Sequence, residues 1–467
     1  MMQRKLLPSD PLQAPPRVPV LVEDTILLLA LALLILAVLL APQHLRAHSK
    51  AKAASPAVAG PRLTSELSGG LAARDGGRLR LAMDLGNIVI HTQNSGRVDY
   101  HARLETDASQ QDARQLLKGF NVYARETPDG VTLRAQTSSK QSSGRLWATL
   151  ELNIPKEYSL DISTGGGNIE TDDINGRVTL STAGGSIKTG NIGGPARLQT
   201  DGGHITVKNV NGELVAATGG GHITAGSVGG SASLRTSGGH IRVAMVEGMA
   251  HLETGGGNIT LEHSGADLLA QTAGGQIEVG EAAGLVRAKT GGGGIRVVRL
   301  SGPTELQTGG GSIYLTQVDS AVRASTGAGG ITAWFVAPAK QPSTCELESS
   351  DGDIVVYLPR ELPVTIDAQI QKGDEHRVIF DPAFPLKVRY DESSKGARVV
   401  RAEGSLNGGG ELLRLRTVAG NIRVVLSDAN KQSQIYRQQM DQLQQQLQSQ
   451  MRKLEQSQQP GADPPQP

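Results

Sequence analysis

The chain has 467 residues with a formal net charge of +1, which excludes the broad basic field that proteins use to bind nucleic acid. Its single cysteine, Cys345, excludes a disulfide framework or a thiolate metal site within one chain. The 59 glycines follow no period of three, so the sequence is not collagen-like, and aromatic residues make up only 3%.

An apolar run near the N-terminus predicts a membrane anchor. Residues 26–41, ILLLALALLILAVLLA, carry no charge, and Thr25 extends the run. A bilayer core needs about 17–20 residues of helix, so we predict a tail over 1–24 and a transmembrane helix over 25–41. A cleaved secretory signal is the alternative, but basic and polar residues follow the run where small residues of a cleavage site are expected.

Residues 42–62, rich in Ala, Pro, Ser and Lys, are predicted to form a linker. The basic residues Arg46, Lys50 and Lys52 lie closer to the apolar run than those before it. By the positive-inside rule, this would leave the C-terminal part in the cytoplasm. The prediction conflicts with the extracytoplasmic location suggested below, so the orientation stays open.

Residues 63–163 are predicted to form an N-terminal β cap with one short helix. The helix is expected in 107-DASQQDARQLLKG-119, where Asp107 and Gln110 have capping-box spacing and Gly119 is a natural stop. Alternating patterns predict strands in 131–137 and 146–154.

Residues 164–333 contain ten copies of one 18-residue unit, beginning with 164-TGGGNIETDDINGRVTLS-181. Every copy has a glycine two residues before an isoleucine, as at Gly167 and Ile169. In the first nine copies, from Val178 to Val322, the residue nine positions after the isoleucine is small or aliphatic, apart from Thr304. A second glycine series lies nine residues after the first in most copies. Each unit therefore divides into two half-units of nine.

Two half-units with alternating inward residues predict two short strands and two turns per unit, which is a two-sided β-solenoid. The glycines are expected to supply a positive φ or tight packing at the turns. A three-sided helix would need similar residues at Ile169, Asn175 and Ser181, which differ. Tyr314 is the one aromatic residue between 164 and 333, as a thin core requires.

Residues 334–427 are predicted to form an irregular C-terminal β cap. Weak copies of the repeat recur in 349-SSDGDIVVYL-358 and 417-TVAGNIRVVL-426, and another precedes the repeats in 84-DLGNIVI-90. An uncovered end of a solenoid is an open sheet edge that invites polymerisation, so we expect these segments to cover both ends.

Residues 428–458 are predicted to form a Gln-rich helix, and 459–467 a disordered tail. Five residues fall on a and d positions of a coiled coil, with Gln450 interrupting the seam: Tyr436, Met440, Leu443, Leu447 and Leu454. Both weak homo-oligomerisation through this helix and an unpartnered helix are compatible with the pattern.

The sequence resembles the bacterial "putative adhesin" family of β-strand-repeat proteins, which carry a domain of unknown function. The resemblance covers about 80–427 and rests on the T-x-G-G-x-I repeats, on LELNIPKEYSLDISTGGGNI before the first coil, and on the closing GSLNGGGELLRLRTVAGNIRVVL. It implies a β-repeat fold and a cell-envelope setting, and it brings no catalytic residues.

The candidate site residues are three histidines at one position of consecutive units: His204, His222 and His240. Stacked imidazoles could bind zinc or copper. However, the same position holds Asn, Ser, Gln or Gly in the other units, and a fourth ligand is not evident, so we predict no metal site. Repeated calcium binding would need an Asp in every turn, and the residue after the repeat threonine is Asp at position 201 alone.

We therefore predict a non-enzymatic, membrane-anchored envelope protein without a cofactor, which presents a rigid β-solenoid as an adhesin-like scaffold or binding surface. The ligand would be an envelope polysaccharide or a protein. A carbohydrate-active enzyme on a β-helix is one alternative, although no carboxylate pair recurs on the outward positions. A bactofilin-like, self-polymerising scaffold is the other.

Overall fold

The computed structural model describes residues 63–427, except 75, 139–144, 337–343, 383 and 393–397, together with five positions of the tail. Those five, Gln438, Asp441, Gln442, Gln445 and Ser449, are helical and exposed. The predicted transmembrane helix over 25–41 and the apolar seam of the tail lie outside the described residues, so both stay predictions. Within the described part, no helix is long and apolar enough to cross a membrane.

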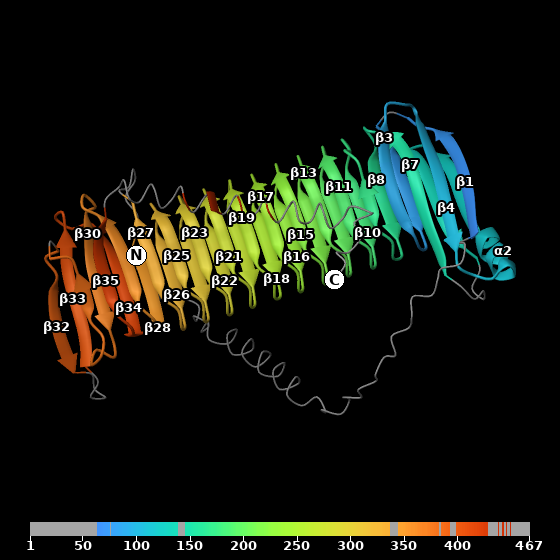
Figure 1. Cartoon of the computed structure of the whole chain (residues 1–467). Coiled ribbons are helices and arrows are strands. Elements are labelled where there is room, and N and C mark those ends of the chain that lie inside the picture. The colour runs from blue at the N-terminus through green and yellow to red at the C-terminus, as the bar shows by residue number, and fades with distance from the viewer. Residues whose placement is uncertain are drawn as a thin grey trace, which may run out of the picture. The chain divides into compact units, whose positions relative to one another are not determined.

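The described residues from 63 to 427 form a stack of coils made of two β-sheets (Figure 1). In spatial order, the first sheet contains β1 (Leu63–Ala72), β4 (Arg97–Thr106), β7 (Leu146–Pro155), β3 (Asn87–Gln93), β9 (Ile169–Thr171), β11 (Ile187–Ile192), β13 (Ile205–Val210), β15 (Ile223–Val228), β17 (Ile241–Val246), β19 (Ile259–Ser264), β21 (Ile277–Ala282), β23 (Ile295–Leu300), β25 (Ile313–Val318), β27 (Ile331–Phe335), β29 (Ile354–Pro359), β35 (Ile422–Ser427) and β31 (Val378–Phe380).

The second sheet contains β5 (Phe120–Thr127), β6 (Gly130–Thr137), β2 (Arg78–Met83), β8 (Ser159–Thr164), β10 (Val178–Thr182), β12 (Ala196–Thr200), β14 (Leu214–Thr218), β16 (Ala232–Thr236), β18 (Ala250–Thr254), β20 (Leu268–Thr272), β22 (Val286–Thr290), β24 (Thr304–Thr308), β26 (Val322–Thr326), β28 (Cys345–Asp351), β34 (Glu411–Ala419), β30 (Val364–Ile370), β33 (Arg398–Leu406) and β32 (Lys387–Glu392). The chain alternates between the sheets, so each 18-residue unit contributes one strand to each. The predicted two-strand coil is therefore confirmed.

The register between coils is a shift of one complete unit. Ile223 pairs with Ile205 on one side and with Ile241 on the other, and all three are buried. On the second sheet, Leu234 likewise lies between Ala216 and Leu252. Because inward positions repeat at the strand spacing, aliphatic side chains stack into ladders and fill the thin space between the sheets.

The weak repeat copies continue these ladders beyond both ends of 164–333. Ile88 pairs with Ile169 upstream, while Ile354 pairs with Ile331 and then with Ile422 downstream. The interpretation of these segments as the same strand–turn pattern is confirmed. Parallel stacking thus extends beyond the ten regular units. The irregular segments contribute further coils to the stack, in addition to the strands that cover its ends.

A threonine hydroxyl joins each coil to the one before it. Thr182 donates a hydrogen bond from Oγ1 to the carbonyl oxygen of Gly167 in the preceding coil and accepts one from the backbone N–H of Gly185 in its own coil. Nine consecutive threonines, from Thr182 to Thr326, donate at 2.7–2.9 Å and accept at 3.1–3.3 Å. The repeated threonine is buried because it satisfies two backbone groups at the turn.

The repeat glycines are required by close packing. Within the described residues, positive φ angles occur at five glycines outside the ten units and at Asn407. A Cβ on Gly239 would instead collide with the carbonyl oxygen of Gly221 in the preceding coil, and each invariant glycine of the series meets the same obstacle. Of the two roles expected for these glycines, tight packing is the one that operates.

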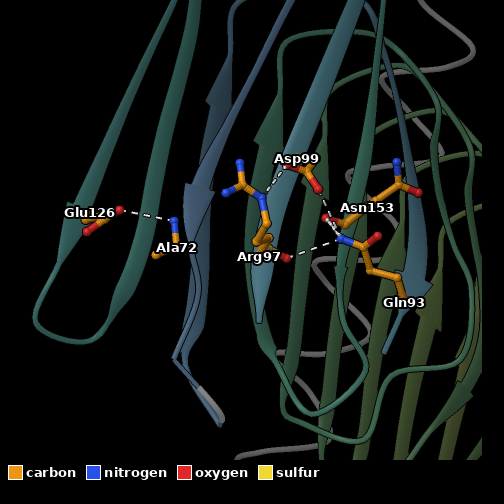
Figure 2. A network of polar contacts seen from close by, with 6 residues as sticks. All are labelled: Ala72, Gln93, Arg97, Asp99, Glu126 and Asn153. Carbon is orange, nitrogen blue, oxygen red and sulfur yellow. Dashed lines mark hydrogen bonds and ion pairs between the residues drawn. The ribbon is translucent and has the colours of Figure 1, made fainter. Parts of the chain in front are cut away.

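The N-terminal cap closes both sheets with antiparallel strands, β1 and β4 on the first and β5 on the second. Figure 2 shows polar contacts among the strands of this cap. The backbone N–H of Ala72 on β1 donates to Oε1 of Glu126 on β5 at 3.1 Å. The amide Nε2 of Gln93 lies 3.3 Å from the carbonyl oxygen of Arg97, from Oδ2 of Asp99 and from the carbonyl oxygen of Asn153.

The short helix of this cap is α2 (Gln110–Gly119), which confirms the predicted helix and its end. Its N-cap is Ser109, whose hydroxyl accepts from the backbone N–H of Asp112 at 3.4 Å. The prediction of Asp107 as the cap is wrong because that carboxylate accepts a hydrogen bond from the backbone N–H of Arg145 at 2.8 Å. The opposite end of the second sheet is closed by antiparallel β33 and β32.

Candidate functional site

The outer faces of the two sheets carry the side chains that can meet a ligand. On the second sheet, opposite charges face each other across neighbouring strands. Arg235 lies 3.2 Å from Glu253, Arg287 lies 3.4 Å from Glu305, and Arg323 lies 3.0 Å from Glu346. These surface ion pairs contribute little stability individually. However, each of the six charged side chains has an oppositely charged partner within the protein.

Aromatic residues meet on the outer face of the first sheet near the C-terminal cap. Trp334 and Tyr357, on neighbouring strands, stack with ring centroids 4.7 Å apart and planes 3° from parallel. The guanidinium of Arg296 lies 5.3 Å from the ring centre of Tyr314. In each of these contacts, one face of a ring meets a neighbouring side chain of the chain itself.

The three candidate histidines form part of a hydrogen-bonded ladder along one turn. Nδ1 of His204 accepts from the backbone N–H of His222 at 2.9 Å, and Nδ1 of His222 accepts from that of His240 at 2.9 Å. Nδ1 of His240 accepts from the N–H of Asn258 at 2.8 Å. Asn168 and Asn258 make the equivalent bond through Oδ1 to the following coil. In these coils the position therefore supplies a hydrogen-bond acceptor to the next coil, a role that the sequence pattern did not reveal.

An accepting Nδ1 requires a neutral imidazole with its proton on Nε2. The rings are stacked with centroids 4.9 Å apart. Burial, together with neighbouring His240, His204 and Arg242, lowers the pKa of His222 from 6.5 to about 4. Burial and Arg242 also lower the pKa of His240.

We expect the histidine ladder to make stability depend on pH. Because the folded pKa of His222 is below the unfolded value, its contribution is complete above about pH 6.5 and is lost as the pH falls toward about 4. The variant His204→Asn/His222→Asn/His240→Asn keeps an acceptor at each position but cannot be protonated. Between about pH 7 and about pH 5, its Tm should fall less than that of the parent chain. An equal fall in both, measured by circular dichroism, would contradict this role.

The ladder also bears on metal binding, because Nδ1 of each histidine already accepts a backbone hydrogen bond. Among the described residues, no group of three or more His, Cys, Asp or Glu side chains is arranged to hold a metal ion. We expect a calorimetric titration with zinc or copper to show no stoichiometric binding. Stoichiometric heat that disappears in the triple Asn variant would establish a metal site at His204, His222 and His240.

A groove of about 610 Å³ lies on the outer face of the first sheet, where the N-terminal cap meets the first regular coils. It extends from β3 across β9, β11 and β13 to β15. Gly190 leaves part of its floor without a side chain. A Cβ there would lie 2.5 Å from Oδ1 of Asp173 and 2.9 Å from the backbone carbonyl carbon of Asp172, so the hollow follows from local packing.

Two carboxylates of the groove are held by the protein itself. Oδ2 of Asp172 lies 3.2 Å from Nδ1 of His91 and accepts from the N–H of Thr92 at 3.3 Å. Oδ1 of Asp173 accepts from the backbone N–H of Asn191 at 2.8 Å and from its side-chain amide at 3.1 Å. These bonds from Asn191, with smaller contributions from nearby lysines, lower the pKa of Asp173.

Three lysines line the same groove: Lys156, Lys188 and Lys208. Within the part of the chain that the structure describes, none of their ammonium groups has an ion-pair or hydrogen-bond partner. Glu170 is the remaining carboxylate of the groove, and its backbone pairs with that of Lys188 on the neighbouring strand. Together with Asp172 and Asp173, this gives the groove three carboxylates and three ammonium groups, so its charges balance.

This groove was not predicted from the sequence. It combines residues that are about eighty positions apart, such as His91 on β3 and Asp172, which directly follows β9. The weak copy 84-DLGNIVI-90 held the necessary signal, because aligning Ile88 with Ile169 also places His91 beside Asp172. From the sequence alone, nothing shows that Gly190 lies at the floor of a groove.

Comparison with known families matches residues 78–290 to the family model described as Toastrack DUF4097. The matched region runs from β2 to the end of β22 and includes the groove and the histidine ladder. A search of curated proteins found no match.

The solved structures that are similar to the chain include three from different bacteria. A "putative cell adhesion protein" from Clostridium sporogenes is 9% identical and covers 78% of this chain and 100% of its own, with a TM-score of 0.15. A "putative adhesin" from Bacteroides fragilis is 9% identical over 78% of this chain and 97% of its own, with a TM-score of 0.22. A "putative adhesin" from Parabacteroides distasonis is 10% identical over 62% of this chain and 96% of its own, with a TM-score of 0.20. At such scores, these titles describe those proteins alone.

Proposed function

Because residues 78–290 match the model of the Toastrack DUF4097 family, we propose that the protein is a non-enzymatic, adhesin-like scaffold of the cell envelope. Residues 25–41 would anchor it in the membrane, and the stack of coils would present a binding surface outside the cytoplasm. The ligand would be an envelope polysaccharide or protein.

One observation carries this proposal: the residues that hold the fold together are separate from those that face outward. Ile223 and Thr218 are buried in ladders that repeat with every coil, whereas the outward position beside the isoleucine changes from Lys188 to Arg242 to Tyr314. A rigid body whose exposed residues vary without affecting its core is suited to present a binding surface.

The proposal is tested in two steps. In intact cells that express the full chain, added protease should cleave the exposed loops of the stack, and the same protease should leave a cytoplasmic marker protein uncut. The purified chain should also be retained on insoluble envelope material from the same cells. Cleavage only after lysis would place the stack in the cytoplasm and refute the envelope role.

The self-polymerising alternative concerns the two ends of the stack, which antiparallel strands cover on the second sheet and at the N-terminal end of the first. We expect a fragment over 63–427 to sediment as a monomer. A fragment over 63–467 should self-associate weakly if the predicted tail helix pairs. Equal masses for both fragments would exclude the tail from assembly, and filaments of the shorter fragment would favour the polymer.

A further inference from the structure

We infer that residues 428–458 dock as a helix on the outer face of the first sheet of the same chain, with the apolar seam of the tail against strands β25 to β15. The occupant of this face is thus a segment of the chain itself. The inference goes beyond the proposed function, because it concerns which part of the stack a ligand can reach.

The outer face of the first sheet is covered where the neighbouring part of the second sheet is open to water. Alternation along β15, β23 and β25 points Thr224, Val298 and Thr316 outward, yet all three are buried. Lys289 on β22 and Gln307 on β24 also point outward, and they are exposed. Because both sheets share one coil spacing, the geometry of the stack does not explain this difference.

Two charged side chains of the same face are also withdrawn from water. Burial lowers the pKa of Arg242 on β17 and raises the pKa of Glu262 on β19, because the charged form of each loses hydration. The described strands all belong to the two sheets, and α2 packs against β1, β4 and β5 at the N-terminal end. These elements supply no second layer over β15 to β25, so another part of the chain is required to cover it.

The tail has the two faces that such a docked helix requires. Its five described positions, from Gln438 to Ser449, recur at helical spacing and are all exposed, so they form one polar face. With about 3.6 residues per turn, a continuous helix would place Met440, Leu443 and Leu447 of the predicted seam on the opposite side. An amphipathic helix with one face in water buries the other against a partner.

The starting point and the length of the tail match the covered strip. Strand β35 ends at Ser427 in the first sheet, so residues 428–458 begin beside the correct sheet. From β35 to β15 there are eight strand steps, or about 38 Å at about 4.8 Å per step. The 31 residues of 428–458 span about 46 Å as a helix, which is enough to reach β15.

The seam also has the spacing that the strands require. One helical turn advances about 5.4 Å, which is close to the distance of about 4.8 Å between neighbouring strands. Successive seam residues therefore meet successive strands, and Leu443 falls about 20 Å beyond β35, close to the strand of Val298. The seven residues 337–343, which follow β27, are too few to cover the same strip and return to β28.

Docking within one chain uses the same seam that pairing between two tails would need. A docked chain should therefore remain a monomer. It would also keep part of the first sheet away from ligands, whereas the outer face of the second sheet and strands β3 to β13 of the first sheet would stay accessible.

The test is maleimide labelling of the full-length chain in detergent micelles, with Val298→Cys as the reporter. The native thiol of Cys345 gives little background, because burial raises its pKa to about 11. The seam variant Met440→Gln/Leu443→Gln/Leu447→Gln should release the tail. We expect it to raise the labelling rate of the introduced thiol by at least about tenfold.

The matched control changes the polar face of the same helix. Gln438→Ala/Gln442→Ala/Gln445→Ala should leave the labelling rate of the reporter unchanged, because these side chains already face water. A reporter on the open second sheet, Lys289→Cys, should react at the same rate whether the seam is intact or replaced. Equal Tm values would show that the variants are folded.

The outcomes separate docking within one chain from its alternatives. Equal labelling rates with the intact and the replaced seam would mean that the tail does not cover this face, and would overturn the inference. Slow labelling in a chain that sediments as a dimer, with rates that rise on dilution, would mean that the tail of a second copy covers it, which also overturns docking within one chain. Thr316→Cys is a second reporter that should give the same result if Val298→Cys lowers the Tm.

Discussion

Replacing Ile241 by Asp is expected to lower the free energy of unfolding by several kcal/mol, on the order of 3–5. Ile241 has no exposed surface and lies between Ile223 and Ile259 in the ladder of the first sheet. A carboxylate at this position would lose its hydration among aliphatic side chains and gain no cation. Thermal unfolding of a fragment over 63–427, followed by circular dichroism, measures the change.

The control for this variant is Thr260→Asp. Thr260 lies one residue beyond Ile259 and faces outward, between Arg242 and Glu278 on the neighbouring strands. A charge here remains hydrated, so we expect a change within about 0.5 kcal/mol. If Ile241→Asp melted within about two degrees of the parent, the assignment of inward and outward positions would be wrong.

Replacing Gly239 by Ala is expected to destabilise the stack by about 3 kcal/mol, although only one methyl group is added. The new Cβ would overlap the carbonyl oxygen of Gly221 in the preceding coil. Relief would require the two coils to separate locally, which would strain the hydrogen bond from Thr236 to the same oxygen. Urea unfolding of the 63–427 fragment should give a lower midpoint.

The neighbouring Gly238→Ala variant separates packing from a general intolerance of glycine replacement. The nearest atom to a Cβ on Gly238 is the carbonyl oxygen of Gly220 at 3.9 Å, which is an ordinary contact. The tenth unit already carries Ala328 at the equivalent position. We expect Gly238→Ala to change stability by less than about 1 kcal/mol. Equal losses in both variants would mean that backbone freedom, and not the close contact, explains the glycines.

The periodic part of the fold could be predicted from the sequence because one rule repeats in every coil. The spacing from Ile169 to Val178 fixed two strands per unit, and the glycine before each isoleucine marked the close turn. The weak copies at Ile88, Ile354 and Ile422 extended the same rule to both caps. Repetition converts a local pattern into a prediction about contacts between distant residues.

Features that depend on one place in the stack were harder to predict. The helix cap was assigned to Asp107 by spacing, but the carboxylate binds a backbone N–H outside the helix and Ser109 takes its place. The histidines were considered as metal ligands because their hydrogen-bonding role requires knowledge of which backbone N–H each ring nitrogen faces. The groove needed both the approach of β3 to β9 and the missing side chain of Gly190.

The threonine–glycine bridges have a consequence for how the length of such a chain can change. Each bridge connects a coil only to its immediate neighbour, so removing residues 237–254 would join Thr236 to Gly255 and restore every bridge across the junction. Removing nine residues would instead send strands of the second sheet into the first and leave a bridge without its glycine. Insertions and deletions should therefore be tolerated in steps of eighteen, and the reach of the protein can be adjusted without redesign of its core.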